Sequence, residues 1–183
     1  MRLVAVAMNE MVLLAVFAHP DDEAFRCGGA LALLAARGVR VQVLTATRGQ
    51  AGSCGDPPLC SPDALPLVRE RELHCACAAL GIEPPILLDY RDSELAMVDE
   101  NEGVAQIVAV MQRIRPDVLL TWPSDGLSGH PDHCAVSRWT GLAFRQALEM
   151  GLDAPAALYH IVMPRSIQQS LGLSAYAQYP MRK

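Results

Sequence analysis

The stretch MVLLAVFAHPDDE, residues 11–23, decides the fold. Its first half, 11–17, is entirely apolar, which predicts a strand covered on both faces, as in a parallel sheet. The chain then changes at once to the polar run HPDDE, residues 19–23. In open parallel sheets, sites form just outside the carboxyl ends of the strands. We therefore expect a functional site directly after this strand.

The rest of the chain alternates strand-like and helix-like segments. The predicted strands are 12–18, 40–47, 85–89, 117–122 and 156–163. The predicted helices are 22–37, 67–80, 102–114 and 130–150. This alternation predicts a Rossmann-like, three-layer α/β/α fold with a mainly parallel sheet of about five strands. We expect one domain over 1–183, with 1–10 as an irregular lead-in.

Two segments add detail to this outline. The first predicted helix has apolar positions at Phe25, Ala30, Leu33 and Leu34. The loop 48–66 is rich in Gly, Pro and Ser and is long for a compact domain, which is typical of functional or mobile loops.

Composition limits the kinds of partner. The chain has 183 residues, 51% of them apolar and 19% charged, which is ordinary for a globular protein. A net charge of −5 argues against a nucleic-acid surface and leaves a small molecule as the expected ligand. The apolar N-terminus is too short to span a bilayer, so we expect no transmembrane segment. Whether the chain forms a homo-oligomer stays open.

The six cysteines favour a reducing, cytoplasmic location. Cys75 and Cys77 are two apart on a predicted helix and point in different directions, so they form no zinc pair. Cys54 and Cys60 flank a Gly/Pro-rich loop and could bridge, but free thiols are the better interpretation.

A second polar segment, SDGLSGHPDH at 124–133, follows the predicted strand 117–122. His130 and His133 are three apart at a helix start and therefore share a face. Together, the HPDD (19–22) and HPDH (130–133) motifs offer three histidines and three aspartates. Two imidazoles and one carboxylate are the usual protein ligands of a catalytic zinc, which lowers the pKa of bound water from ~15.7 toward ~7.

In such a site, one carboxylate of the Asp21–Asp22 pair binds the metal and its neighbour accepts the proton of water. The remaining histidine polarises the substrate carbonyl, stabilises the oxyanion or protonates the leaving group. The structural alternative is that Asp21, Asp22, Glu23, His130 and Asp132 are helix caps. Capping, however, does not require three histidines at two strand ends.

The motifs AHPDDE (18–23) and GHPDH (129–133) resemble those of the zinc-dependent de-N-acetylases of the PIG-L/LmbE superfamily. That superfamily includes N-acetylglucosaminylphosphatidylinositol deacetylases and the deacetylases of mycothiol and bacillithiol biosynthesis. The similarity covers roughly 12–147. It includes CGGALALLAARGVRVQVLTATRGQAG (27–52), Arg69 with Glu72, DYRDSEL (89–95) and RPDVLLTW (115–122).

The resemblance implies a hydrolase that removes the acetyl group from an N-acetylated amino sugar, such as an N-acetylglucosamine conjugate, or from a related linear amide. It implies one Zn²⁺ per chain, bound by three residues: His19, Asp22 and His133. It also implies Asp21 as the general base and His130 as the group that stabilises the tetrahedral intermediate. Arg69 and Asp92 match positions that contact the sugar. The alternatives for these two are pairing of Arg69 with Glu72 or neighbouring acids on its helix, and capping of a turn by Asp92.

The sequence departs from the family at three places. Gln50 stands where the family usually has an acid, and Ser128 stands where mycothiol deacetylases have a tyrosine. Family members usually run on well beyond Lys183, so a fragment, a short subclass and a degenerate copy are all open.

Two other functions therefore compete with deacetylation. One is a non-catalytic metal- or sugar-binding protein of the same fold. The other is a mononuclear Fe²⁺ enzyme, because two histidines and a carboxylate also form the ferrous facial triad.

Overall fold

The computed structural model describes residues 11–151, 155–164 and 166, so the expected lead-in at 1–10 lies outside the described residues. Five parallel strands form one sheet in the order β3-β2-β1-β4-β5. The strands are β1 (Val12–Phe17), β2 (Arg40–Thr47), β3 (Ile86–Tyr90), β4 (Val118–Thr121) and β5 (Ala157–His160). The helices are α1 (Asp22–Ala36), α2 (Leu65–Leu80), α3 (Glu100–Ile114) and α4 (Pro131–Glu149), with a 3₁₀ turn η1 (Leu95–Met97). The predicted fold class is confirmed.

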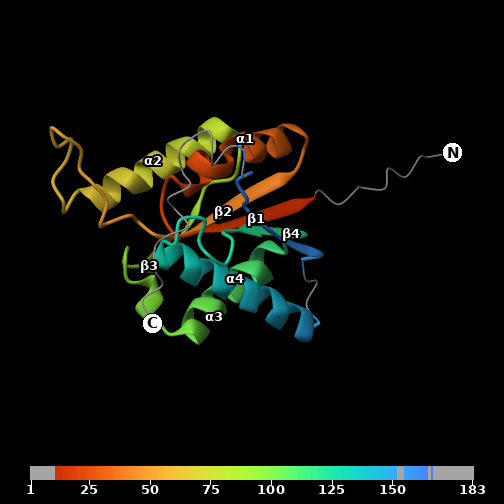
Figure 1. The fold of residues 1–183 in the computed structure, drawn as a ribbon. Coiled ribbons are helices and arrows are strands. Elements are labelled where there is room, and N and C mark those ends of the chain that lie inside the picture. Colours follow the sequence, from red (N-terminus) through yellow and green to blue (C-terminus); the bar gives the residue numbers. More distant parts are fainter. Residues whose placement is uncertain (1–10, 152–154, 165, 167–183) are drawn as a thin grey trace.

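The helices cover both faces of the sheet, with α1 and α2 on one side and α3 and α4 on the other (Figure 1). Successive side chains of a strand point to opposite faces, so β1 contributes to two cores. Leu14 and Val16 pack with the α3 and α4 residues, whereas Leu13, Ala15 and Phe17 pack with those of α1 and α2. This burial on both faces explains why β1 is apolar at every position.

The buried side of α1 differs from what its apolar residues suggest. Phe25 and Leu33 are 78% and 52% exposed, and the helix packs inward through Glu23, Gly28 and Leu31 instead. The cause lies at the start of the helix, where Asp22 and Glu23 turn inward and thereby set the rotation of the following turns. Of the apolar positions noted in the sequence, Leu34 does pack against the core, whereas Phe25 and Leu33 do not.

The order of the strands places two chain segments side by side. β1 lies between β2 and β4 in the sheet. From β1 the chain passes through α1 to β2 on one side, and β4 pairs with β1 on the other side. The carboxyl ends of β1 and β4 thus flank a switch in strand order, where open α/β sheets form their sites. HPDDE follows the end of β1, and GHPDH follows the end of β4 after the loop 122–128.

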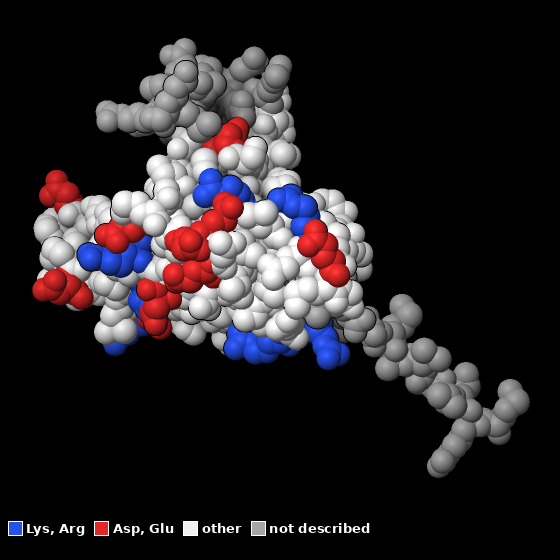
Figure 2. All heavy atoms as spheres, turned by 90° about the horizontal axis from the view of Figure 1, so that it is seen from below, with Lys and Arg blue, Asp and Glu red and all other residues white. Residues whose placement is uncertain are grey.

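Charged side chains on the face seen from below form separate groups, with acidic residues gathered near the middle (Figure 2). That face offers no continuous basic surface of the kind that nucleic acids require. Among the described residues, no helix has the length and apolar character needed to cross a membrane.

Candidate metal centre

Asp22 is fixed by the turn that connects β1 to α1. Its Oδ2 accepts hydrogen bonds from the backbone N–H groups of Ala18 (3.1 Å) and His19 (3.0 Å). The N-cap residue is Asp21, whose side chain makes no capping hydrogen bond. Helix capping by these side chains, the alternative considered for the sequence, is therefore not how the aspartates are used. Asp22 instead faces the histidine three residues before it.

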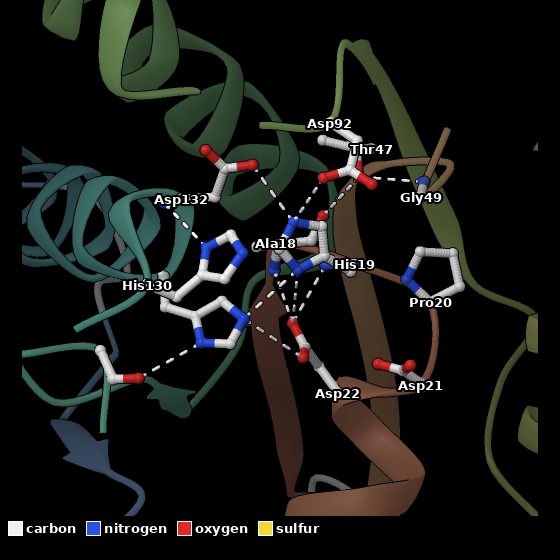
Figure 3. A network of polar contacts seen from close by, with 12 residues as sticks. Ala18, His19, Pro20, Asp21, Asp22, Thr47, Gly49, Asp92, His130 and Asp132 are labelled. Carbon is white, nitrogen blue, oxygen red and sulfur yellow. Dashed lines mark hydrogen bonds and ion pairs between the residues drawn. The ribbon is translucent and has the colours of Figure 1, made fainter. Parts of the chain in front are cut away.

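Potential ligand atoms from two segments, HPDDE and GHPDH, converge beside this turn (Figure 3). His19 Nδ1 lies 3.3 Å from His133 Nε2, and His133 Nε2 lies 3.5 Å from Asp22 Oδ1. The three residues are between 5% and 9% exposed. The structure thus brings together the residues that the sequence predicted as metal ligands.

The outer nitrogen of each imidazole already has a partner. His19 Nε2 lies 3.1 Å from Asp92 Oδ1 and 3.2 Å from Asp132 Oδ2, and dashed lines mark both contacts in Figure 3. His133 Nδ1 lies 3.2 Å from the carbonyl oxygen of Gly126, to which it donates. These bonds place the protons on the outer nitrogens and turn the inner lone pairs toward one another and toward Asp22.

Such a cluster of acceptors fits a cation. Two imidazole lone pairs 3.3 Å apart, with a buried carboxylate beside them, repel one another unless a positive charge lies between them. Two histidines and one aspartate form the ligand set of many zinc sites. The donor set is therefore suited to a divalent metal ion.

The pKa values of the cluster reflect the same arrangement. Burial lowers the pKa of His19, but hydrogen bonds to Asp132 and Asp92 raise it more, to about 9. Burial raises the pKa of Asp22 to about 6. Burial, together with the nearby His19 and His130, lowers the pKa of His133 to about 3. Without a metal, a proton on His19 thus supplies the positive charge, and His133 stays neutral.

A second group of atoms, from His19, His130 and Asp132, also lies within 4.8 Å of one another. In this group, the carboxylate of Asp132 and Nδ1 of His130 already accept hydrogen bonds from backbone N–H groups. Asp132, fully buried, accepts hydrogen bonds from the N–H groups of Ser93 (2.7 Å) and Leu95 (3.2 Å). His130 Nδ1 accepts from the N–H of Asp132 and so caps α4, which confirms the capping alternative for this residue. The His19–Asp22–His133 set is therefore the better metal site.

Asp21 lies at the rim of the cluster and is held by Arg69. Its φ of 102° is in the left-handed region that non-glycine residues seldom adopt. Arg69 Nη2 donates to Asp21 Oδ2 (3.0 Å) and to the carbonyl of Pro20, and Nη1 donates to the carbonyl of Gly49 (3.0 Å). Arg69 thus pairs with Asp21, not with the acids of its own helix.

Asp92 joins the cluster to the loop after β2. Burial raises its pKa, but the hydrogen bond and charge of His19 lower it more, to about 2, so it is an anion beside His19. Its Oδ2 accepts from the N–H of Ala51 (3.0 Å). Gln50 lies next to this link and makes two bonds that an acid could not make together: it donates to the carbonyl of Tyr90 and accepts from the N–H of Asp92.

A cavity of about 390 Å³ opens onto the cluster. Its lining includes all seven predicted site residues: His19, Asp21, Asp22, Arg69, Asp92, His130 and His133. The exposed aromatic side chain of Phe25 adds an apolar surface to the same lining. The volume lies within the ~300–1,000 Å³ typical of small-molecule sites.

Two residues of the site were not assigned from the sequence. Asp132 contacts His19 Nε2, and its position inside the HPDH motif was the feature of the sequence that could have indicated this role. Trp122 stacks on His133, and its only signal was its place directly after β4. The six cysteines, all described, are free, so Cys54 and Cys60 are not bridged.

Fold and site together define an α/β domain with a candidate mononuclear metal centre at the switch point of a parallel sheet. Comparison with known proteins identifies the family within this class. Residues 14–144 match the family model PIG-L, described as GlcNAc-PI de-N-acetylase, and the chain belongs to this family.

Three similar proteins illustrate the family. The chain is 33% identical to a 1D-myo-inositol 2-acetamido-2-deoxy-alpha-D-glucopyranoside deacetylase of Thermobispora bispora, over 87% of this chain and 62% of that protein. It is 37% identical to a probable N-acetyl-alpha-D-glucosaminyl L-malate deacetylase of Bacillus cereus, over 70% and 59%. The structure of an N,N'-diacetylchitobiose deacetylase from Pyrococcus horikoshii has the same fold, with a TM-score of 0.69, 20% identity, and coverage of 94% of this chain and 72% of that one.

The chain thus spans about three-fifths of the length of these two curated relatives.

Proposed function

We propose that the protein is a zinc-dependent hydrolase that releases acetate from an N-acetylated amino sugar, such as an N-acetylglucosamine conjugate. The observation that carries this proposal is the convergence of His19, Asp22 and His133 in a cavity that Asp21 also lines. The names of the relatives support the substrate class, because both sequence relatives are described as deacetylases of amino-sugar conjugates.

His19, Asp22 and His133 would hold the ion. A bound Zn²⁺ supplies Lewis acidity, which polarises the amide carbonyl and makes water more acidic. Zinc is favoured over Fe²⁺ because facial-triad iron oxygenases are familiar on all-β scaffolds, whereas this sheet is parallel and covered by helices.

Asp21 is the proposed general base. Its carboxylate borders the cavity and contacts none of the three ligand side chains, so it is free to accept a proton from the attacking water. Arg69 holds the carboxylate in place through a 3.0 Å ion pair. The water oxygen forms a bond to the acetamide carbon, the carbon–nitrogen bond breaks, and the proton goes to the departing amine.

His130 is the proposed donor to the developing oxyanion. Because its Nδ1 accepts a hydrogen bond from the backbone of Asp132, the neutral ring carries its proton on Nε2. Burial and the charge of His19 lower the pKa of His130, which keeps it in this neutral form. An N–H donor at the cavity wall is suited to stabilising an oxyanion.

Arg69 and Asp92 are proposed to contact the sugar as well as to order the site. Both line the cavity, and both also have partners within the protein, namely Asp21 and His19. A small-molecule amino sugar as substrate and a cytoplasmic location are parts of the same proposal.

The test is acetate release from a panel of N-acetylglucosamine conjugates, with metal analysis of protein purified without added metal. The proposal predicts equimolar acetate and free amine, together with about one zinc per chain. Tightly bound iron would contradict the choice of zinc. Sugar binding without acetate release from any member of the panel would replace the proposal with a non-catalytic binding function.

A further inference from the structure

Trp122 stacks directly on the metal ligand His133. The two rings are parallel within 5°, and their centroids are 4.0 Å apart. Trp122 is only 1% exposed, so this contact takes place in the interior, at the end of β4.

His133 is enclosed on its other sides as well. The ring of His130 stacks on it at 4.6 Å and 24°, and the carbonyl oxygen of Gly126 accepts from its Nδ1. The two stacked rings fix the plane of the imidazole, and the hydrogen bond fixes the rotation within that plane. Together they determine the direction of the Nε2 lone pair.

The position of Trp122 is itself well determined. Its carbonyl oxygen accepts hydrogen bonds from Ser137 Oγ and His160 Nδ1, each 2.7 Å long, and Phe17 packs edge-on at 5.8 Å. Its indole Nε1, in contrast, has no hydrogen-bond partner among the residues that the structure describes. The side chain therefore contributes to the site through the face of its ring, not through a polar bond.

We propose that Trp122 is a positioning residue for His133 and that its fluorescence reports metal binding. The inference rests on the proposed metal site but concerns affinity and not turnover. A ligand that is held in its bound orientation loses less conformational freedom when the metal binds. An ion at His133 also places charge next to the indole, and Zn²⁺ has no redox chemistry of its own that would quench emission.

The chain provides a matched control in its only other tryptophan. Trp139 is also 1% exposed, but it lies on α4 against Tyr90, with ring centroids 5.6 Å apart. Neither tryptophan is in the lining of the cavity, so the two differ in the stacking of Trp122 on His133. Trp139→Leu therefore removes a buried indole of the same size without touching His133.

The experiment measures the Zn²⁺ dissociation constant by chelator competition in the full chain and in three variants. Trp122→Leu should bind zinc about 10–100-fold more weakly, the usual effect of losing a group that orients a ligand. Trp122→Phe, which keeps an aromatic face, should recover much of the affinity. Trp139→Leu should lose thermal stability but retain the wild-type dissociation constant.

A fluorescence titration keeps the test decisive even where Trp122→Leu does not fold. Zn²⁺ should change the emission of the wild type and of Trp139→Phe, and should leave that of Trp122→Phe unchanged. Equal zinc affinity of wild type and Trp122→Leu, or equal weakening by Trp139→Leu, would overturn the positioning role alone. A wild type that binds no zinc would overturn the metal site and this inference with it.

Discussion

Replacing Asp21 by Asn separates the proposed base from a structural role. Asn keeps an oxygen that accepts the hydrogen bond from Arg69, and it tolerates the positive φ of 102° at this position. It cannot accept the proton of water. We expect kcat/KM for acetate release to fall about 10²–10⁴-fold, the usual contribution of a general base, or about 3–5 kcal/mol.

Stability and metal content should hardly change. The side chain of Asp21 is 68% exposed, and exposed ion pairs contribute about 0–1 kcal/mol, so the free energy of unfolding should change by less than that. Within the described residues, the N–H and side-chain hydrogen bonds of Asp21 go to Glu23 and Arg69 and not to His19 or His133, so zinc per chain should equal that of the wild type.

The assay is steady-state acetate release, with elemental analysis and thermal unfolding of the same preparations. Asp89→Asn is the matched control, because Asp89 is 88% exposed, pairs with Arg48, and lies outside the lining of the cavity. It removes the same charge from a comparable pair and should keep wild-type activity. Activity of Asp21→Asn within about threefold of the control, or loss of its metal, would refute the assignment of Asp21 as base.

Three further predictions concern the metal and its surroundings. Removing zinc with a chelator should abolish acetate release, and it should lower Tm by about 8–16 °C if the free ion concentration had been ~1,000 times Kd. Re-addition of zinc should restore both the activity and Tm. An unchanged Tm and rate would argue against a bound ion. Asp132→Asn should weaken zinc binding about 10–100-fold, because His19 Nε2 loses a carboxylate partner, and unchanged affinity in chelator competition would contradict this. Gly49→Ala should displace Arg69 and lower kcat/KM, because a Cβ at position 49 would lie 1.9 Å from Arg69 Nη1. Gly38→Ala is the control: with φ of 85° and no atom within 4 Å of its Cβ, it should carry the same backbone cost of about 1–2 kcal/mol without loss of activity. Equal activities of the two variants would contradict the role of Arg69.

The ends of β1 and β4 illustrate what the sequence could predict. Both strands are apolar and both are followed by His-Pro-Asp, so a parallel sheet brings the two motifs to one edge. That placement predicted a cluster of histidines and aspartates, and the resemblance to the PIG-L/LmbE superfamily then assigned His19, Asp22 and His133 as the ligands. No side-chain detail was needed for this step.

The partners of the ligands could not be predicted in the same way. His19 Nε2 meets Asp92 and Asp132, which lie 73 and 113 residues further along the chain, and the tautomer depends on those contacts. Nor does the spacing of apolar residues in α1 reveal that Asp22 and Glu23 turn inward and leave Phe25 exposed. Such features depend on tertiary packing, which overrides local periodicity.

The most direct test of the account is an anomalous-scattering measurement at the zinc absorption edge on crystals of the zinc-loaded protein. We expect one strong peak per chain, surrounded by His19 Nδ1, Asp22 and His133 Nε2. A peak beside His130 and Asp132, or no peak near His19, would contradict it.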